Sequence, residues 1–153
     1  MRIGIASDHA GFELKKELLA YLAESHNSVV DFGAPLFDAG DDFPDYVVPL
    51  AKAVSKGQVS RGIAICGSGV GACVAANKVR HIRAAIVHDL FSAGQGVEDD
   101  DMNVICIAAN LTEAILAKEL VGRFLKSQFS GKPRFKRRLE KIDRLEEMAF
   151  KDE

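Results

Sequence analysis

The residues best suited to chemistry in this sequence are a cysteine and the three alternating glycines that follow it: Cys66, Gly67, Gly69 and Gly71. Residues 61–66 form a short apolar run bounded by a turn signal, which predicts a buried strand. The small residues after the glycines predict a helix, and a glycine loop that opens a helix aims several N–H groups at one point. Such a loop suits a phosphate group or a developing oxyanion. Because open α/β sheets bind ligands at the carboxyl ends of their strands, we place the candidate site at this corner.

The thiol of Cys66 could serve as a base that moves a proton. An unperturbed thiol has a pKa of about 8.5, and N–H groups at the start of a helix lower it, so a thiolate at neutral pH is feasible. The competing interpretation is a small buried hydrophobic residue. We favour the functional interpretation because three glycines and a helix start follow directly. Cys73 and Cys106 lie within apolar segments without that setting, and we expect both to pack in the core.

Two polar residues after the first predicted strand and one in the glycine loop are further candidates. Asp8 and His9 follow the apolar run at residues 3–6, so they also lie at a carboxyl end. Asp8 can cap the next helix and bind a ligand at once. We favour a ligand role for His9 because of its place at the strand end. Ser68 either satisfies the geometry of the loop or contacts a substrate, and we favour the contact.

The last quarter of the chain is basic, and two of its arginines could bind phosphate. Arg134 and Arg138 are four residues apart, so they share one face of a predicted helix. Their guanidinium groups match phosphate geometry, although a solvated charged face explains the pattern equally well without other information. The acidic residues 98–101 are predicted to form a solvated loop, with Asp99 as a candidate contact for sugar hydroxyls.

Strands and helices alternate along the chain, which predicts a single α/β domain over residues 1–153. Its five-stranded parallel sheet would carry helices on both faces, a three-layer Rossmann-like or flavodoxin-like fold with an extra C-terminal helix. That helix would dock either across a subunit boundary or on its own domain. A loop is predicted at residues 97–102, and Thr112 is predicted to cap the helix after the fifth strand. The predicted strands are 3–6, 27–32, 61–66, 83–87 and 103–108, and the predicted helices are 12–22, 44–54, 70–78, 90–96, 112–128 and 134–148.

Composition narrows the class of protein. With 48% hydrophobic and 27% charged residues, the 153-residue chain has the make-up of an ordinary soluble domain. A formal net charge of −2 gives no reason to expect nucleic acid or a membrane surface as a partner. Charged residues interrupt any apolar signal region near the start. Three cysteines without ligand spacing argue against a disulfide framework or a zinc site, so we expect a reduced, cytoplasmic protein.

Several segments occur together in an order typical of one enzyme family. They are Ser-Asp-His-Ala-Gly-Phe after the first strand, Phe-Pro-Asp-Tyr, Cys-Gly-Ser-Gly-Val-Gly with Ala-Ala-Asn-Lys behind it, Ile-Arg-Ala-Ala, and a basic C-terminal helix. Over nearly its full length the sequence resembles the ribose-5-phosphate isomerase B and galactose-6-phosphate isomerase family. The resemblance implies aldose–ketose isomerisation of a sugar phosphate without a metal or other cofactor. It also implies a homodimer, or a dimer of dimers, with shared active sites.

The resemblance also implies roles for individual residues. Cys66 matches the cysteine that moves the proton between C1 and C2, because the glutamate that some relatives use instead would stand at Ala72. Ser68 matches a hydroxyl beside the sugar. The remaining matches are Gly67, Gly69 and Gly71 to the loop that holds the enediolate oxygen, Asp8 and His9 to a pair that contacts sugar hydroxyls and phosphate, and Arg134 and Arg138 to a phosphate clamp.

Three positions depart from the family pattern. Asp99 and Asp100 stand where members acting on ribose 5-phosphate carry His-Asn, whose histidine helps to open the sugar ring. We accordingly place Asp99 in the catalytic set and Asp100 in the substrate-binding set. Phe43 replaces a tyrosine, and Asn110 replaces an arginine. Because a tetrose esterified at O4 cannot close a five-membered ring, its isomerase needs no ring-opening histidine, and a tetrose phosphate becomes a candidate substrate.

Two alternatives come from other functional classes. Gly67, Gly69 and Ala72 satisfy the G-x-G-x-x-A spacing of a nucleotide-binding module, and Asp89 lies at a strand end about twenty residues on. The motif follows the third strand rather than the first, however, and Cys66 has no task in dinucleotide binding. The second alternative is a non-catalytic relative that binds a sugar phosphate, which the three departures allow and the intact cysteine opposes.

Overall fold

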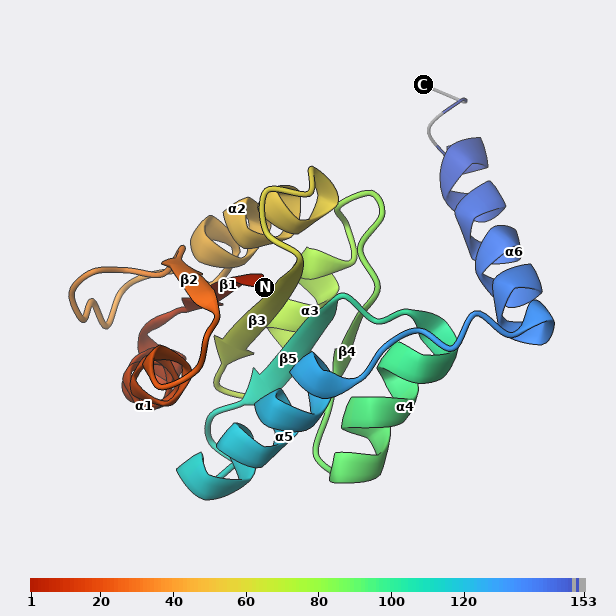
Figure 1. The fold of residues 1–153 in the computed structure, drawn as a ribbon. Coiled ribbons are helices and arrows are strands. Elements are labelled where there is room, and N and C mark those ends of the chain that lie inside the picture. Colours follow the sequence, from red (N-terminus) through yellow and green to blue (C-terminus); the bar gives the residue numbers. More distant parts are fainter. Residues whose placement is uncertain (150, 152–153) are drawn as a thin grey trace.

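Short apolar runs alternate with amphipathic helices, and in the computed structural model these runs form one sheet of five parallel strands (Figure 1). The structure describes residues 1–149 and 151. The strand order is β2-β1-β3-β5-β4. The strands are β1 (Arg2–Ser7), β2 (Ser28–Asp31), β3 (Arg61–Cys66), β4 (Ala84–Ile86) and β5 (Val104–Ala108), and the helices are α1 (Phe12–Ala23), α2 (Pro44–Ser55), α3 (Val70–Ala76), α4 (Leu90–Asp100), α5 (Ala114–Lys126) and α6 (Pro133–Ala149), with a 3₁₀ turn, η1 (His9–Gly11).

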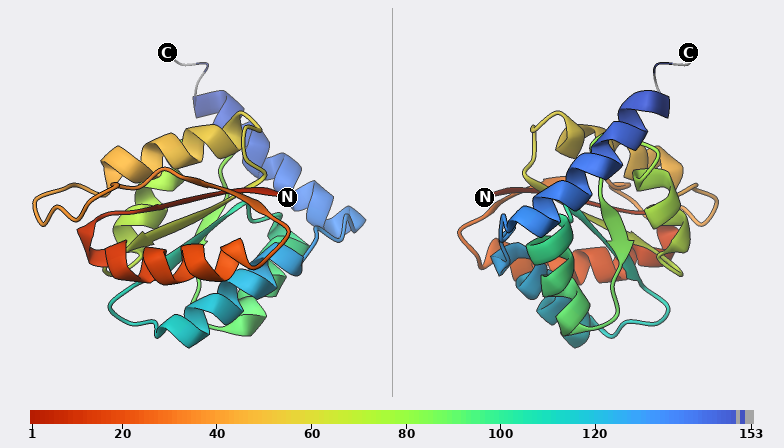
Figure 2. Two further views of the ribbon diagram at one scale, coloured as in Figure 1. Left: turned by 60° about the vertical axis from the view of Figure 1, so that its left-hand side comes forward. Right: turned by 90° about the vertical axis from the view of Figure 1, so that its right-hand side faces the viewer.

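Helices cover both faces of the sheet, so the predicted three-layer α/β fold is confirmed (Figures 1 and 2). The apolar sides of α1, α4 and α5 pack on one face, and those of α2 and α3 pack on the other. The order differs from that of flavodoxin in one respect, because β5 lies next to β3 and β4 takes the edge. No helix in the described part of the chain is long and apolar enough to cross a bilayer.

The strand that carries the cysteine lies at the centre of the sheet. β3 pairs with β1 on one side and with β5 on the other, in a register that aligns Ile5, Ile63 and Ile105. A strand covered on both faces buries every side chain, which explains why its sequence is continuously apolar rather than alternating. All strands are parallel, so the segments after β1, β3 and β5 leave the sheet at the same edge.

The last helix stands apart from the other layers. α6 lies beyond the β4 side of the sheet (Figures 1 and 2), and Glu146 near its C-terminal end accepts a hydrogen bond from the His81 backbone amide at 2.8 Å. Phe135 is its buried residue, whereas Ile142, Leu145 and Met148 are between 51% and 69% exposed. The helix therefore contacts its own domain and also leaves an apolar stripe in solvent.

The prediction of an acidic loop at residues 97–102 is wrong, because α4 continues to Asp100. Asp89 caps this helix, accepting a hydrogen bond from the Ser92 amide at 2.7 Å. Ala93 and Val97, four residues apart, are both fully buried, so the core-facing stripe extends the helix into the acidic segment. The acidic residues occupy its outer side, and Asp101, the C-cap residue just after the helix, has a φ of 49°.

The predicted cap of the fifth helix is also wrong. α5 begins at Ala114 with Glu113 in the N-cap position, and the amide of Ala117 donates to the Glu113 carbonyl at 2.9 Å. Thr112 lies one residue too early to cap this turn and is buried, with 7% of its surface exposed. The helix therefore starts without a side-chain cap.

Candidate active site

Three chain segments meet at the carboxyl edge of the sheet. The turn η1 follows β1, the glycine loop follows β3, and Asn110 follows β5. The Asn110 amide donates to the Gly67 carbonyl at 3.0 Å, and the Ala109 amide donates to the Cys66 carbonyl at 2.9 Å. A Cβ atom added at Gly67 would lie 3.5 Å from Cβ of Ala10. The sheet therefore brings Cys66, the glycine loop and the Asp8–His9 turn to one corner.

The glycine loop is held tightly against the sheet. Gly69 has a φ of 76°, in the left-handed region that favours glycine, and a Cβ there would lie 3.3 Å from the backbone nitrogen of Ala108. Ser68 is exposed, and its hydroxyl accepts a hydrogen bond from the Val70 amide at 3.2 Å. Ser68 therefore stabilises the turn into α3, and its exposed position leaves it able to contact a substrate as well.

Two of the positions that depart from the family pattern lie directly against the glycines. A Cβ atom added at Gly71 would lie 2.6 Å from Cζ of Phe43, and one at Gly67 would lie 2.9 Å from Nδ2 of Asn110. The space beside each glycine is thus occupied by a side chain of this protein. Phe43 and Asn110 consequently define the walls next to the loop, with an apolar ring on one side and a neutral amide on the other.

Cys66 ends β3 on the face of the sheet that α2 and α3 cover. It belongs to the buried hydrophobic cluster on that face, which also includes Ala6, Leu50 and Ala72. It is buried, with 4% of its surface exposed. Burial to this extent separates most of the residue from bulk water.

A second thiol near this cluster has an unusual protonation equilibrium. Cys73 on α3 has its pKa lowered to about 6, chiefly by a hydrogen bond with Cys106 and also by one from Asn77. The same hydrogen bond, together with burial, raises the pKa of Cys106 well above its usual range. Cys106 is fully buried, as expected for a residue that packs in the core. Cys73 is only half-buried, so the expectation that it packs in the core holds only in part. Its partner Cys106 is distant in sequence, which is why the local pattern did not reveal the pair.

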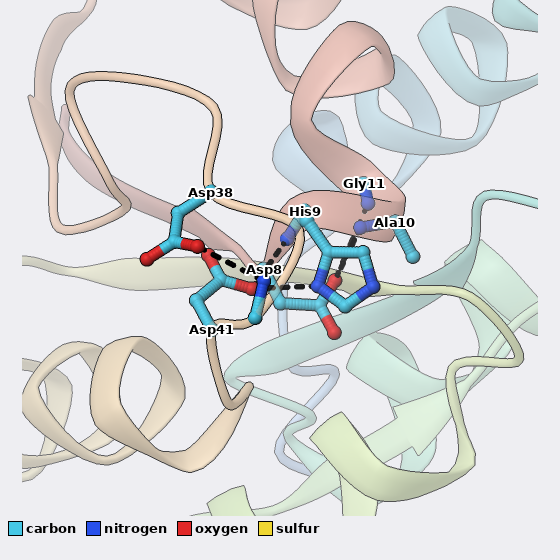
Figure 3. A network of polar contacts seen from close by, with 7 residues as sticks. Asp8, His9, Ala10, Gly11, Asp38 and Asp41 are labelled. Atoms are coloured by element: carbon cyan, nitrogen blue, oxygen red, sulfur yellow. Dashed lines mark hydrogen bonds and ion pairs between the residues drawn. The ribbon is translucent and has the colours of Figure 1, made fainter.

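Asp8 and His9 are held by different contacts (Figure 3). Asp8 is buried, and its Oδ1 accepts hydrogen bonds from the amides of Ala10 at 3.0 Å and Gly11 at 3.3 Å, so the predicted capping role is present. His9 instead contacts Asp41, whose Oδ1 lies 2.7 Å from the ring Nδ1. This hydrogen bond raises the pKa of His9, and the nearby charge of Asp8 adds to the effect.

Asp8, His9 and Asp41 are residue types that can bind a metal ion, so their geometry decides whether they form a metal site. In the described part of the chain, Asp8, His9 and Asp41 offer ligand atoms that all lie within 4.8 Å of one another. The 2.7 Å between Nδ1 and Oδ1 is a hydrogen-bond length, whereas two ligands of a tetrahedral zinc ion lie about 3.3 Å apart. Asp8 Oδ1 is already used by two backbone amides. The geometry is that of a hydrogen-bonded group, and we assign no metal to it.

The remaining predicted site residues lie elsewhere in the chain. Asp99 and Asp100 end α4 just before β5 begins, so they lie beside the amino ends of the strands, whereas Cys66 lies at a carboxyl end. The five residues of β5 alone span roughly 15 Å between those edges. Asp99 accepts a hydrogen bond from Gln95 on the same helix at 3.0 Å.

The two arginines are also remote from the glycine loop. Arg134 and Arg138 lie on the first turns of α6, where their guanidinium carbons are 5.2 and 5.8 Å from the centre of the Phe135 ring. α6 packs near α4, away from the end of β3 at which Cys66 lies (Figure 1). One chain thus carries two separate groups of predicted site residues.

Comparison with known proteins identifies the family. The sequence model described as Ribose/Galactose Isomerase matches residues 3–142. The chain belongs to the ribose/galactose isomerase family. It is 37% identical over 146 residues to ribose-5-phosphate isomerase B of Escherichia coli, covering 95% of this chain and 97% of that protein. It is 36% identical over 131 residues to D-erythrulose-4-phosphate isomerase of Pectobacterium atrosepticum, covering 86% of each.

A solved structure of the ribose/galactose isomerase family matches the fold closely. Ribose-5-phosphate isomerase B of Mycoplasma genitalium, determined with bound ribulose-5-phosphate, superposes with a TM-score of 0.91 at 41% identity. The match covers 95% of this chain and 96% of that one. The family resemblance drawn from the sequence is therefore confirmed. Membership also argues against the nucleotide-binding alternative, because the G-x-G-x-x-A spacing here belongs to an isomerase glycine loop.

Proposed function

We propose that this protein interconverts an aldose phosphate and its ketose phosphate, with Cys66 as the base. The thiolate removes the proton from C2 of the aldose, the proton on O2 passes to O1, and the thiol returns its proton to C1. N–H groups of the glycine loop stabilise the negative charge that develops on the oxygen, and a remote grip on the phosphate orients the sugar. The observation that carries the proposal is the meeting of Cys66, the loop and the Asp8–His9 turn at one corner, in a chain of this isomerase family.

The second group of predicted residues completes the site only if it comes from another chain. Asp99, Asp100, Arg134 and Arg138 lie far from Cys66 within one chain, and α6 presents an uncovered apolar stripe. We propose a homodimer in which α4 and α6 of one subunit reach the glycine loop of the other. Each active site would then combine the cysteine of one subunit with the arginines of its partner.

Mixed dimers test this shared arrangement. One subunit carries Cys66→Ala and the other carries Arg134→Ala with Arg138→Ala. In a shared arrangement one of the two sites in the mixed dimer combines an intact cysteine with intact arginines, so about half of the wild-type activity returns. Each variant homodimer alone stays inactive. Activity that does not return on mixing would contradict the shared site, because both sites would then be damaged.

The substrate that we favour is a tetrose phosphate. Asp99 stands where the family's ribose 5-phosphate isomerases carry the histidine that helps to open the furanose ring, and a tetrose 4-phosphate has no such ring to open. Phe43 and Asn110 make the loop walls neutral and less polar. One of the similar proteins, from Pectobacterium atrosepticum, is named as a D-erythrulose-4-phosphate isomerase.

A substrate panel decides between these possibilities. Initial rates are measured with tetrose 4-phosphates, pentose 5-phosphates and hexose 6-phosphates, with the Cys66→Ala variant as the control for each. We expect the highest kcat/KM with a tetrose phosphate. A clear preference for a pentose phosphate would remove the tetrose assignment but leave the isomerase proposal intact. Binding without turnover of any sugar phosphate would favour a non-catalytic relative instead.

A further inference from the structure

We propose that Asp41 is a positioning residue that holds the imidazole of His9, so that the opposite ring nitrogen, Nε2, serves as a hydrogen-bond donor toward the substrate. The inference deepens the proposed function, because it concerns how His9 meets the sugar phosphate. Asp41 is 32 residues from His9 and belongs to the long connection between β2 and α2. Neither its residue type nor its spacing in the sequence predicts a contact between Asp41 and His9.

The contacts of Asp41 fix both the backbone and the ring of His9. Its Oδ1 accepts a hydrogen bond from the His9 amide at 2.9 Å and lies 2.7 Å from Nδ1 of the ring (Figure 3). The carboxylate is an acceptor only, so this short contact places a proton on Nδ1. Two bonds to one oxygen restrict both the chain direction and the ring orientation. Nε2 then points away from the carboxylate.

The two side chains of the pair differ in burial: Asp41 is buried and His9 is partly exposed. The Asp41 side chain is 5% exposed, whereas the His9 side chain is 37% exposed. The inner ring nitrogen of His9 is hydrogen-bonded to Asp41, and the outer part of the ring is exposed to solvent. This is the arrangement expected when a buried residue orients a neighbour that contacts the substrate. In imidazoles generally, the hydrogen bond made by one nitrogen decides the state of the other.

The surrounding charges favour the protonated ring. The hydrogen bond to Asp41 raises the pKa of His9 against the opposing effect of burial, and the charges of Asp8 and Asp41 add to it. Burial alone would raise the pKa of Asp41, but the hydrogen bonds from His9 outweigh it and the pKa is lowered. Tyr46 also faces this carboxylate, and burial and the charge of Asp41 raise the pKa of its phenol. Phe37 contacts the ring of His9 edge-on. The imidazolium therefore persists to a higher pH than for a free histidine.

A direct test follows the titration of His9 by NMR of its ring nitrogens. In the wild type we expect Nδ1 to stay protonated and the imidazolium to persist above the usual range. Asp41→Asn keeps the shape of the side chain but loses its charge, so the His9 midpoint falls to a lower pH. Asp38→Asn is the matched control, because this neighbouring carboxylate bonds only the Gly40 amide among the described residues, and the midpoint there stays as in the wild type. An unchanged midpoint in Asp41→Asn would overturn the proposal.

Kinetics separate positioning from a merely structural role. With the best substrate of the panel, Asp41→Asn should raise KM about tenfold at neutral pH with a smaller change in kcat, and the alkaline rise in KM should begin at a lower pH. His9→Asn should have a similar effect, and the double variant should be no worse than His9→Asn alone. Full additivity in the double variant would contradict action through His9. If no sugar phosphate is turned over, the proposed function fails, and the NMR titration still decides the role of Asp41.

Discussion

At the scale of single residues, the contact between Gly71 and Phe43 defines the wall of the glycine loop. A Cβ at Gly71 would lie 2.6 Å from the Phe43 ring, closer than carbon atoms can approach. We expect Gly71→Ala to lower the free energy of unfolding by about 2 kcal/mol through overpacking. Urea denaturation of the variant measures this loss.

The control for this contact is a double variant. Because Phe43→Ala removes the ring, adding Gly71→Ala to it should cost little further stability. A double variant that loses the full cost of both single substitutions would show that the contact with Phe43 is not the cause.

The low pKa of Cys73 predicts selective chemical reactivity. A pKa of about 6 means that the thiol is protonated below that pH and largely thiolate at neutral pH. We expect alkylation of Cys73 by iodoacetamide, followed by peptide mass spectrometry, to reach half its maximal rate near pH 6. Cys106 should stay unlabelled in the native protein because it is fully buried and its pKa is raised.

The partner of Cys73 provides the control for this reactivity. Cys106→Ala removes the main hydrogen bond that stabilises the thiolate, so the midpoint of Cys73 alkylation should move to a higher pH. An identical profile in the two proteins would show that the hydrogen bond is not responsible.

Residue patterns predicted those parts of the site that are contiguous in sequence. Adjacent residues in the sequence are sufficient to predict Cys66 with its glycines and Asp8 with its capped turn, because strand ends and caps are local features. The contacts that shape the site join distant segments: Asp41 with His9, Phe43 with Gly71, and Asn110 with Gly67. Such pairs depend on the sheet order and on the path of long connections, which local patterns do not contain.

At the scale of elements, alternation of strands and helices predicted the sheet but not every boundary. The charge of the acidic residues after Gly96 predicts a loop, yet Val97 continues the buried stripe of α4. Charged residues occupy the outer side of an amphipathic helix, so their presence does not indicate where the helix ends. Thr112 is a favourable cap residue by type, but the N-cap position of α5 falls on the next residue, Glu113.

The link between α1 and the end of β2 depends on a buried lysine. Lys15 is 2% exposed, and its Nζ donates to both oxygens of Asp31 and to the carbonyl of Ala34. We expect Lys15→Met to lower the free energy of unfolding by about 2 kcal/mol, because Asp31 and the carbonyl lose their donor. Urea denaturation gives the value.

The adjacent lysine is a matched control for Lys15. Lys16 is 58% exposed and pairs with Glu13 on the surface of the same helix. Because exposed ion pairs contribute little, Lys16→Met should leave the unfolding curve nearly unchanged. Equal effects of the two substitutions would contradict the account of Lys15 as an anchor.

At the scale of the whole molecule, the predicted site residues form two groups at opposite edges of one sheet. The apolar stripe of α6 is the surface that we expect a second copy to cover. Leu145 is 69% exposed, so Leu145→Glu would place a charge in that interface. Light scattering after gel filtration should show a dimer for the wild type and a shift toward monomer for the variant.

The other face of the same helix supplies the control. Asp143 lies two residues away from Leu145 and therefore points in another direction around α6. Asp143→Lys should leave the dimer intact. A Leu145→Glu variant with the mass of the wild type would contradict the proposed interface.

The most direct test of the account is the transfer of solvent deuterium into the carbon skeleton of a sugar phosphate. In D₂O the wild type should place deuterium on the carbon beside the carbonyl, because the proton held by Cys66 exchanges with solvent before it returns. Cys66→Ala should bind the sugar phosphate but incorporate deuterium about 10³-fold more slowly. Incorporation by Cys66→Ala at the wild-type rate would contradict the assignment of this thiol as the base.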